Sequence, residues 1–242
     1  MKFSYLLTAL IFFSSTLFGQ NYERKNVCGT DTITVEHWSL KTGDKIQYKA
    51  FECTKVSKLG IRIDLGFNHY IYNSKTRNWL GNHNGVLFGL TIAYGDFNFG
   101  VKFKPATVNP KQVLDFDGQR LTEDAKLNPI KVDYDFSYSV NLKHNFAIEP
   151  YIALTAKSFI VINENEIGKS YDINKTKGLT IGTTLNKYFK LKDFQFLALF
   201  VKYGYGLSDF KKINENLGIG YSDIVIGVAY KGFIKQQFLK RL

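Results

Sequence analysis

Residues 130–142 read Ile-Lys-Val-Asp-Tyr-Asp-Phe-Ser-Tyr-Ser-Val-Asn-Leu. Every second residue is apolar or aromatic, and each one between is polar or charged. Because successive side chains of a β-strand point to opposite faces, this alternation predicts a strand with one apolar face and one polar face.

The same alternation occurs in seven further stretches between Leu59 and Phe233. They span residues 59–72, 85–95, 97–104, 146–157, 178–185, 197–206 and 223–231. Eight short runs of period two predict an all-β chain. No run of about 18 apolar residues follows the first 20 residues, so any membrane crossing would have to use these strands.

Glycine indicates which face of these strands points outward. Almost every glycine within the runs lies on the polar face, whereas Phe, Ile, Leu and Tyr crowd the other face. The interior of an eight-stranded barrel is just wide enough for side chains, so it needs small residues. The sequence therefore predicts a membrane-spanning, antiparallel, up-and-down β-barrel of eight strands with its apolar face in lipid.

The connections between the runs alternate in length. Short ones lie at Gly95-Asp96, 143–145 and 190–193, and long ones at 73–84, 105–129, 160–176 and 207–218. Outer-membrane barrels have short turns on the periplasmic side and long loops outside. This pattern favours an outer-membrane location, with both chain ends in the periplasm.

The polar face carries many charges, which the barrel would enclose. Because a buried charge is tolerated only when it is paired, we expect a salt-bridged plug without an open pore. The alternative is that some of them form an ion path, a proton path or a catalytic cluster. The inward charges are Arg62, Asp64, Lys102, Lys104, Lys131, Asp133, Asp135, Glu149, Lys157, Lys202, Asp223 and Lys231.

Residues 1–20 have the features of an export signal. Lys2 precedes an apolar stretch that ends at Phe18-Gly19-Gln20, which predicts cleavage after Gly19 or Gln20. A retained membrane anchor is the alternative, but the stretch is shorter than the roughly 20 residues that a spanning helix needs. The whole chain has a formal net charge of +11, which favours contact with anionic lipid headgroups or reflects solvated loops and a charged lumen.

Residues 21–57 precede the barrel and predict a hairpin in the periplasm. Its arms, 32–40 and 45–54, flank Thr42-Gly43-Asp44. Cys28 and Cys53 are the only cysteines, and export to an oxidising compartment predicts a disulfide between them. We expect this hairpin to cap or plug the barrel; two further barrel strands, making ten, are the alternative.

The eight runs from Leu59 to Phe233 resemble small outer-membrane barrels of the OmpA/OmpX type. The resemblance rests on architecture and on no diagnostic motif. It implies a barrel over residues 58–234, with lipid, lipopolysaccharide and the barrel-assembly machinery as partners. One departure is the tail at 235–242, since such barrels usually end at an aromatic residue.

The sequence carries few signs of catalysis. No phosphate loop, dinucleotide fingerprint, metal site, cofactor site or nucleic-acid motif is present. We therefore expect a non-enzymatic surface scaffold for binding, adhesion or envelope integrity, with protein partners at its loops or its periplasmic segment. One alternative is a component of an envelope secretion or assembly machine. Another is a lipid A modifying enzyme that uses His37, Ser39 and Glu52.

Overall fold

The computed structural model describes residues 27–38, 43–116, 119–121, 126–162, 170–192, 194–212 and 217–242. The predicted signal peptide lies outside these residues, so its cleavage stays a prediction. None of the helices in the described ranges is long and apolar enough to cross a bilayer.

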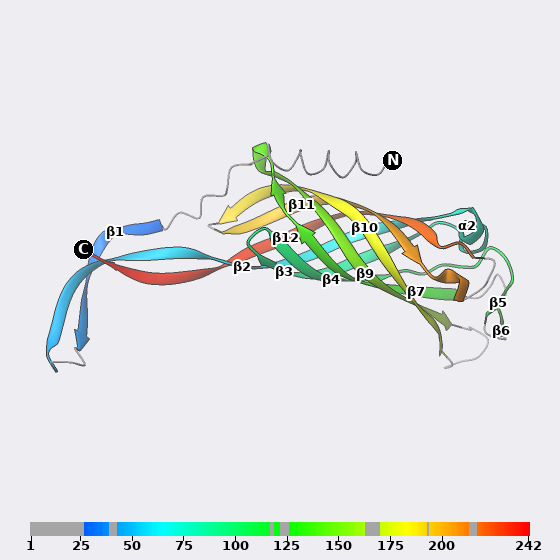
Figure 1. Cartoon of the computed structure of the whole chain (residues 1–242), viewed down its shortest axis with the longest axis horizontal. Coiled ribbons are helices and arrows are strands. Elements are labelled where there is room, and N and C mark those ends of the chain that lie inside the picture. The colour runs from blue at the N-terminus through cyan, green and yellow to red at the C-terminus, as the bar shows by residue number, and fades with distance from the viewer. Residues whose placement is uncertain are drawn as a thin grey trace, which may run out of the picture.

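Eight strands form a closed ring in which every neighbouring pair is antiparallel (Figure 1). They are β2 (Lys45–Tyr72), β3 (His83–Tyr94), β4 (Phe97–Pro105), β7 (Lys126–Tyr138), β9 (Phe146–Ile162), β10 (Ser170–Lys192), β11 (Gln195–Ser208) and β12 (Gly220–Arg241). The ring closes between the first and last of them, where Gly227 of β12 lies opposite Gly66 of β2. The predicted eight-stranded up-and-down barrel is confirmed. The ten-stranded alternative is wrong, because β1 (Val27–Trp38) pairs with β2 outside the ring.

The remaining elements are short and lie in the connections. At the end with long connections, called here the loop end, lie α2 (Ser74–Leu80), the strand pair β5 (Leu114–Phe116) and β6 (Gln119–Leu121), and the 3-10 turn η2 (Phe210–Lys212). The other end, called the turn end, has tight connections such as Gly95-Asp96, where Gly95 adopts a φ of 68° that glycine tolerates at little cost.

The stretch that opened the sequence analysis is interrupted near its end. β7 stops at Tyr138, and a two-residue strand, β8 (Val140–Asn141), continues the pairing with β9. Between them the backbone N–H of Ser139 donates to the carbonyl oxygen of Asp96, 2.7 Å away. This bond continues the register of β4 with β7, in which Phe97 lies opposite Tyr138. The predicted single run is assigned as two strands, but its pairing with β9 keeps one register across the break, from Ser137 opposite Tyr151 to Val140 opposite Ile148. A 3-10 turn, η1 (Lys143–Asn145), then leads into β9.

The two faces of the barrel differ as the alternation predicts. Exterior side chains such as Phe67, Leu154 and Ile226 are 62–75% exposed, whereas the inner-face residues next to them include the buried Asn68, Ala153, Thr155 and Val225. Aromatic residues Tyr94 and Phe97 at the turn end, and Tyr203 and Tyr205 toward the loop end, are also exposed. A wall of exposed Ile, Leu, Val and Phe is stable in acyl chains and not in water, so the barrel is built to span lipid.

β2 and β12 run past the turn end without a break in the chain. After a register shift between Phe233 and Lys235, the pairing resumes with Lys235 opposite Val56 and continues to Arg241 opposite Ala50. The boundary expected between residues 57 and 58 thus falls inside β2, and the expected tail at 235–242 is the end of β12. The chain passes from the barrel to the segment beyond it without leaving either strand, because the hydrogen-bond ladder does not stop where the barrel does.

These strand ends and β1 form a three-stranded sheet, called here the extension. It consists of β1, residues 45–58 of β2 and residues 234–241 of β12. The expected hairpin is present, but it leads away from the barrel and neither caps nor plugs it (Figure 1). The predicted disulfide joins Cys28 of β1 to Cys53 of β2, which are directly paired positions of this sheet.

Candidate functional site: the charged lumen

Every charged residue predicted on the inner face lies in the barrel interior. All of them are buried except Asp135, whose side chain retains 8% of its exposure. They come from six strands: Arg62 and Asp64 from β2, Lys102 and Lys104 from β4, Lys131, Asp133 and Asp135 from β7, Glu149 and Lys157 from β9, Lys202 from β11, and Asp223 and Lys231 from β12. The period-two geometry of a strand aims each of these side chains inward.

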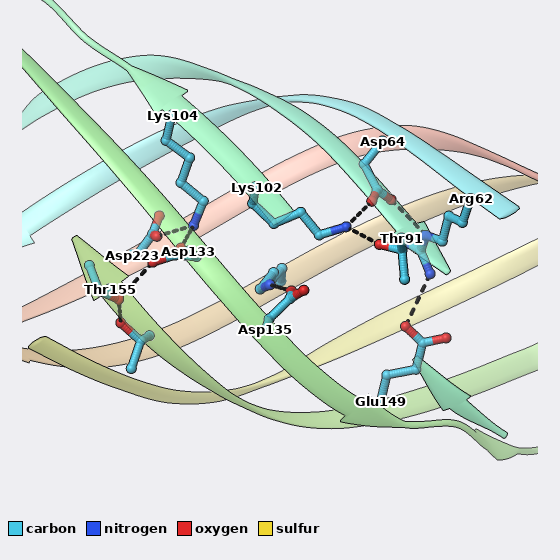
Figure 2. Close-up of polar contacts among 12 residues, drawn as sticks. Arg62, Asp64, Thr91, Lys102, Lys104, Asp133, Asp135, Glu149, Thr155 and Asp223 are labelled. Atoms are coloured by element: carbon cyan, nitrogen blue, oxygen red, sulfur yellow. Dashed lines mark hydrogen bonds and ion pairs between the residues drawn. The ribbon is translucent and has the colours of Figure 1, made fainter. Parts of the chain in front are cut away.

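The group nearest the turn end is centred on Arg62 (Figure 2). Its Nε atom lies 2.6 Å from Oδ1 of Asp64, and its Nη1 atom lies 3.0 Å from Oε2 of Glu149. Asp64 also accepts a hydrogen bond from the ammonium group of Lys102. Arg62 therefore forms ion pairs with two carboxylates from different strands. One of these, Asp64, also pairs with a second cation, Lys102.

Two uncharged side chains complete the surroundings of Glu149. The hydroxyls of Ser139 and Tyr188 donate to its Oε1 atom over 2.8 and 3.1 Å. The sequence analysis did not single out Tyr188. The signal was available, because Tyr188 follows Thr184 and Asn186 in the inward alternation of β10.

A second group, closer to the loop end, is a closed ring of two lysines and two aspartates. Lys131 Nζ lies 3.2 Å from Asp133 Oδ2 and 3.0 Å from Asp223 Oδ2. Lys104 Nζ lies 3.0 Å from the same oxygen of Asp133 and also contacts Asp223. The ring is neutral, and Thr155 donates a further hydrogen bond to Asp133 over 2.7 Å.

Lys202 and Asp135 form a third pair between these groups. Lys202 Nζ lies 2.8 Å from Asp135 Oδ2 and 3.8 Å from the centre of the Tyr151 ring. Beside them is a cavity of ≈20 Å³, lined among others by Arg62, Lys102 and Tyr151. A space of that size holds about one water molecule. In the described part of the chain, side chains fill the lumen.

Aromatic side chains close the barrel at the loop end. Lys157 Nζ lies 4.8 Å from the ring centres of both Tyr70 and Tyr72, and 5.2 Å from that of Phe210. The same ammonium group donates a hydrogen bond to the Tyr72 hydroxyl. Further buried residues pack over this layer: Trp79, Leu80, Leu127, Leu217 and Tyr221.

The sequence analysis missed this aromatic layer. Tyr70 and Tyr72 continue the inward alternation of β2 past Asn68, and Tyr221 precedes Asp223 by two residues on the inner face of β12. The interior of a narrow barrel has little room for large aromatic side chains. They fit because they lie at the mouth, where α2 and η2 cover them.

The residues considered for lipid A chemistry are not brought together. Ser39 lies outside the described residues. His37 pairs through its backbone with Ile46, and Glu52 is six positions further along β2. At about 3.3 Å per residue this separates the two by roughly 20 Å along the strand, too far for a hydrogen-bonded triad.

The lumen arrangement is suited to holding a structure together. At least ten of its twelve inward charges form an ion pair with a carboxylate or a cationic group inside the barrel. The described residues contain no group of three His, Cys, Asp or Glu side chains that could hold a metal ion. Buried pairs of this kind favour one arrangement of the strands, because an arrangement that separates the partners leaves a buried charge without compensation.

The chain has structural similarity to several solved outer-membrane proteins. Neisserial surface protein A aligns with 74% of this chain and 99% of its own, at 14% identity and a TM-score of 0.47. Ail of Yersinia pestis, in complex with the heparin analogue sucrose octasulfate, aligns with 72% of this chain and 98% of its own, at 10% identity and a TM-score of 0.43. OprG of Pseudomonas aeruginosa aligns with 74% of this chain and 95% of its own, at 11% identity and a TM-score of 0.42.

Sequence comparison adds no relative. No family model matches the chain, and no curated protein matches it. The fold assignment therefore rests on the strand pairing and the distribution of side chains in this chain itself.

Proposed function

We propose that this protein is a non-enzymatic barrel of the outer membrane that acts as a rigid scaffold for its loop end. The observation that carries this proposal is the lumen, where paired charges and aromatic residues occupy the space a channel would need. Such an interior makes the barrel rigid, and the connections at the loop end are then the surface available for binding.

Three features support an outer-membrane location. The exterior of the barrel is apolar and belongs in lipid. The predicted signal peptide and the Cys28–Cys53 disulfide both fit an exported protein in an oxidising compartment. The tight connections at the turn end favour a periplasmic position for that end, with the chain termini. Lipid, lipopolysaccharide and the assembly machinery would be its partners there.

The base of the loop end is fixed by hydrogen bonds between distant segments. The side chain of Asn73 caps α2 by accepting from the Thr76 N–H over 3.1 Å. Thr76 Oγ1 in turn donates to the Gly218 carbonyl over 3.1 Å and accepts from the Gly218 N–H over 3.0 Å. The connections before β3 and β12 are thereby tied together, so they present a preorganised surface.

Loop replacement combined with two envelope measurements tests the proposal. The connection at 106–125 is replaced by a short turn, and attachment of whole cells to protein-coated surfaces is compared with wild type and with a deletion strain. We expect the variant to assemble as a heat-modifiable barrel, that is, one whose mobility in a detergent gel changes on heating. We expect its cells to lose attachment to the same extent as cells of the deletion strain. We also expect no conductance steps in planar bilayers and an unchanged lipid A mass spectrum in the deletion strain.

Three results would contradict the proposal. Wild-type attachment by the loop variant would show that the loops are not the binding surface. Reproducible conductance would show that the lumen opens, and an altered lipid A mass would point to the enzyme alternative.

A further inference from the structure

The extension reaches well beyond the membrane surface. Residues 45–58 of β2 lie past the turn end, and at about 3.3 Å per residue they span roughly 46 Å. The headgroup layer on one side of a bilayer is only about 5–8 Å thick. Figure 1 shows the β2–β12 ribbon continuing beyond the turn end of the barrel, and the β1–β2 hairpin bending sharply from the end of that ribbon. Most of this sheet therefore stands clear of lipid.

One face of the extension is strongly basic. Directly paired residues of an antiparallel sheet share a face, and alternate residues of each strand share it too. By this register one face, called here the basic face, carries four exposed lysines and one acid, Glu36. The residues on it include Thr32, Thr34, Glu36, Lys45, Gln47, Lys49, Phe51, Cys53, Lys55, Gln236, Phe238 and Lys240.

Among the described residues, Glu36 is the one acidic side chain that the register places on this face. Glu36 is engaged by Lys45 at 2.5 Å and accepts a hydrogen bond from Gln47 at 2.6 Å. Lys49, Lys55 and Lys240 are three further exposed cations, and the described residues of this face offer no acidic side chain besides Glu36. Such a cluster attracts a surface of opposite charge.

The opposite face carries fewer cations and more apolar surface. Its charged residues include Lys235, Arg241 and Glu52, and Ile33, Ile46 and Leu239 on it are each 41–44% exposed. Arg241 on that face stacks over the Tyr48 ring, with its Cζ atom 5.0 Å from the ring centre, and Glu52 lies beside Leu239 in the register. Gln236 and Gln237 are neighbours in the chain, both exposed, and lie on opposite faces, which gives a matched pair of positions.

The extension is also held in one arrangement. The disulfide joins β1 to β2, and seven consecutive residue pairs join β2 to β12. A platform ordered in advance loses little conformational entropy when it binds a partner.

We propose that the basic face of the extension is a docking surface for a folded periplasmic protein that presents a cluster of surface carboxylates. Reach excludes lipid headgroups for the outer half of the sheet, and three uncompensated lysines favour an acidic partner. This inference rests on the proposed membrane placement, but it concerns the end of the molecule opposite to the loops.

Site-specific crosslinking in intact cells tests this inference. A photo-crosslinking amino acid is placed at Gln236 on the basic face, and in a second variant at Gln237 on the opposite face. We expect one dominant protein adduct from position 236, at least 10-fold stronger than from position 237. Its crosslinked peptide, identified by mass spectrometry, should contain several Asp or Glu residues.

Charge reversal makes the test specific. Lys49→Glu with Lys240→Glu should reduce the adduct at least 10-fold, the double Gln variant should reduce it less, and reversing the partner's acidic residues to Lys should restore it. An equal adduct from both positions, no adduct, an adduct with lipopolysaccharide or a second copy of this chain, or failure of the charge swap would each overturn the inference.

Two controls separate this inference from the scaffold function. Heat-modifiability of every variant shows whether the barrel has folded. The loop variant described above should keep the adduct at position 236, so loss of attachment and loss of docking are independent results.

Discussion

Arg62 and Glu149 are 87 positions apart in the sequence, yet Arg62 Nη1 lies 3.0 Å from Glu149 Oε2 in the barrel interior. Both side chains are buried, and Glu149 receives two further hydrogen bonds, from Ser139 and Tyr188. The contact links β2 to β9, which are not neighbours in the sheet. It therefore links opposite sides of the barrel, in addition to the hydrogen bonds between neighbouring strands.

Removing the Glu149 carboxylate should destabilise the barrel strongly. Glu149→Ala leaves Arg62 buried with Asp64 as its remaining acid, and breaking a buried pair in this way costs about 3–5 kcal/mol. The measurement is the free energy of unfolding in urea, in lipid vesicles. Glu36→Gln, which breaks an exposed pair in the extension, is the control and should have a much smaller effect. Equal losses from the two variants would contradict a bracing role for Glu149.

Gly204 should accept no larger residue while Tyr151 is present. A methyl group at position 204 would overlap the Tyr151 hydroxyl and lie 2.9 Å from Cγ2 of Thr180. Overpacking of this kind costs about 1–3 kcal/mol, so Gly204→Ala should lower the unfolding free energy by that amount. Adding Tyr151→Phe should recover part of it, because the clashing oxygen is then absent. Val201→Leu on the lipid-facing wall is the control, and additive effects of the two lumen changes would speak against direct contact.

A charge on the barrel wall should hinder insertion. Leu90 is 56% exposed and lies in the middle of β3, opposite Ile63 and Val101. An Arg near the bilayer midplane of a barrel costs about 2–4 kcal/mol, so Leu90→Arg should reduce the folded fraction in vesicles. Thr34→Arg in the extension should not reduce it. Unimpaired insertion of the Leu90 variant would mean that this wall does not face lipid.

Loss of the disulfide should affect the extension and spare the barrel. Cys28 and Cys53 are 25 positions apart, for which the chain-entropy model gives a stabilisation of about 3–4 kcal/mol. In Cys28→Ser with Cys53→Ser, amide hydrogen exchange should accelerate in β1 and in residues 45–54 of β2. The heat-modifiable shift of the barrel should remain. Faster exchange throughout the barrel would show that the two parts unfold together.

Acidification should loosen the β1–β2 hairpin at its tip. Hydrogen bonds from the side chains of Lys45 and then Gln47 lower the pKa of Glu36 below the usual glutamate value. A carboxyl with a lowered folded pKa stabilises the folded state above its unfolded pKa, and that stabilisation is lost as pH falls through the folded pKa. A carbon-13 NMR titration of Glu36 should give a low midpoint, and Lys45→Gln should raise it. A midpoint unaffected by Lys45→Gln would rule out this cause.

The sequence predicted the lumen residues more reliably than their partners. Alternation places Asp133 and Asp223 on the inner face, since the direction of a side chain on a strand depends only on the local backbone. Their shared contacts with Lys104 and Lys131 depend on the stagger between strands, which is a property of the closed barrel. No spacing along the chain encodes that stagger.

The sequence by itself determined that this chain forms eight two-faced strands, with glycine and charge inside and apolar residues outside. The physical reason is that a period of two is enforced residue by residue. Only the tertiary structure decided that β2 and β12 continue into a disulfide-linked sheet outside the barrel, and that tyrosines close the loop end. Both features depend on which distant segments meet when the ring closes, because hydrogen bonds and burial there come from partners far away in the sequence.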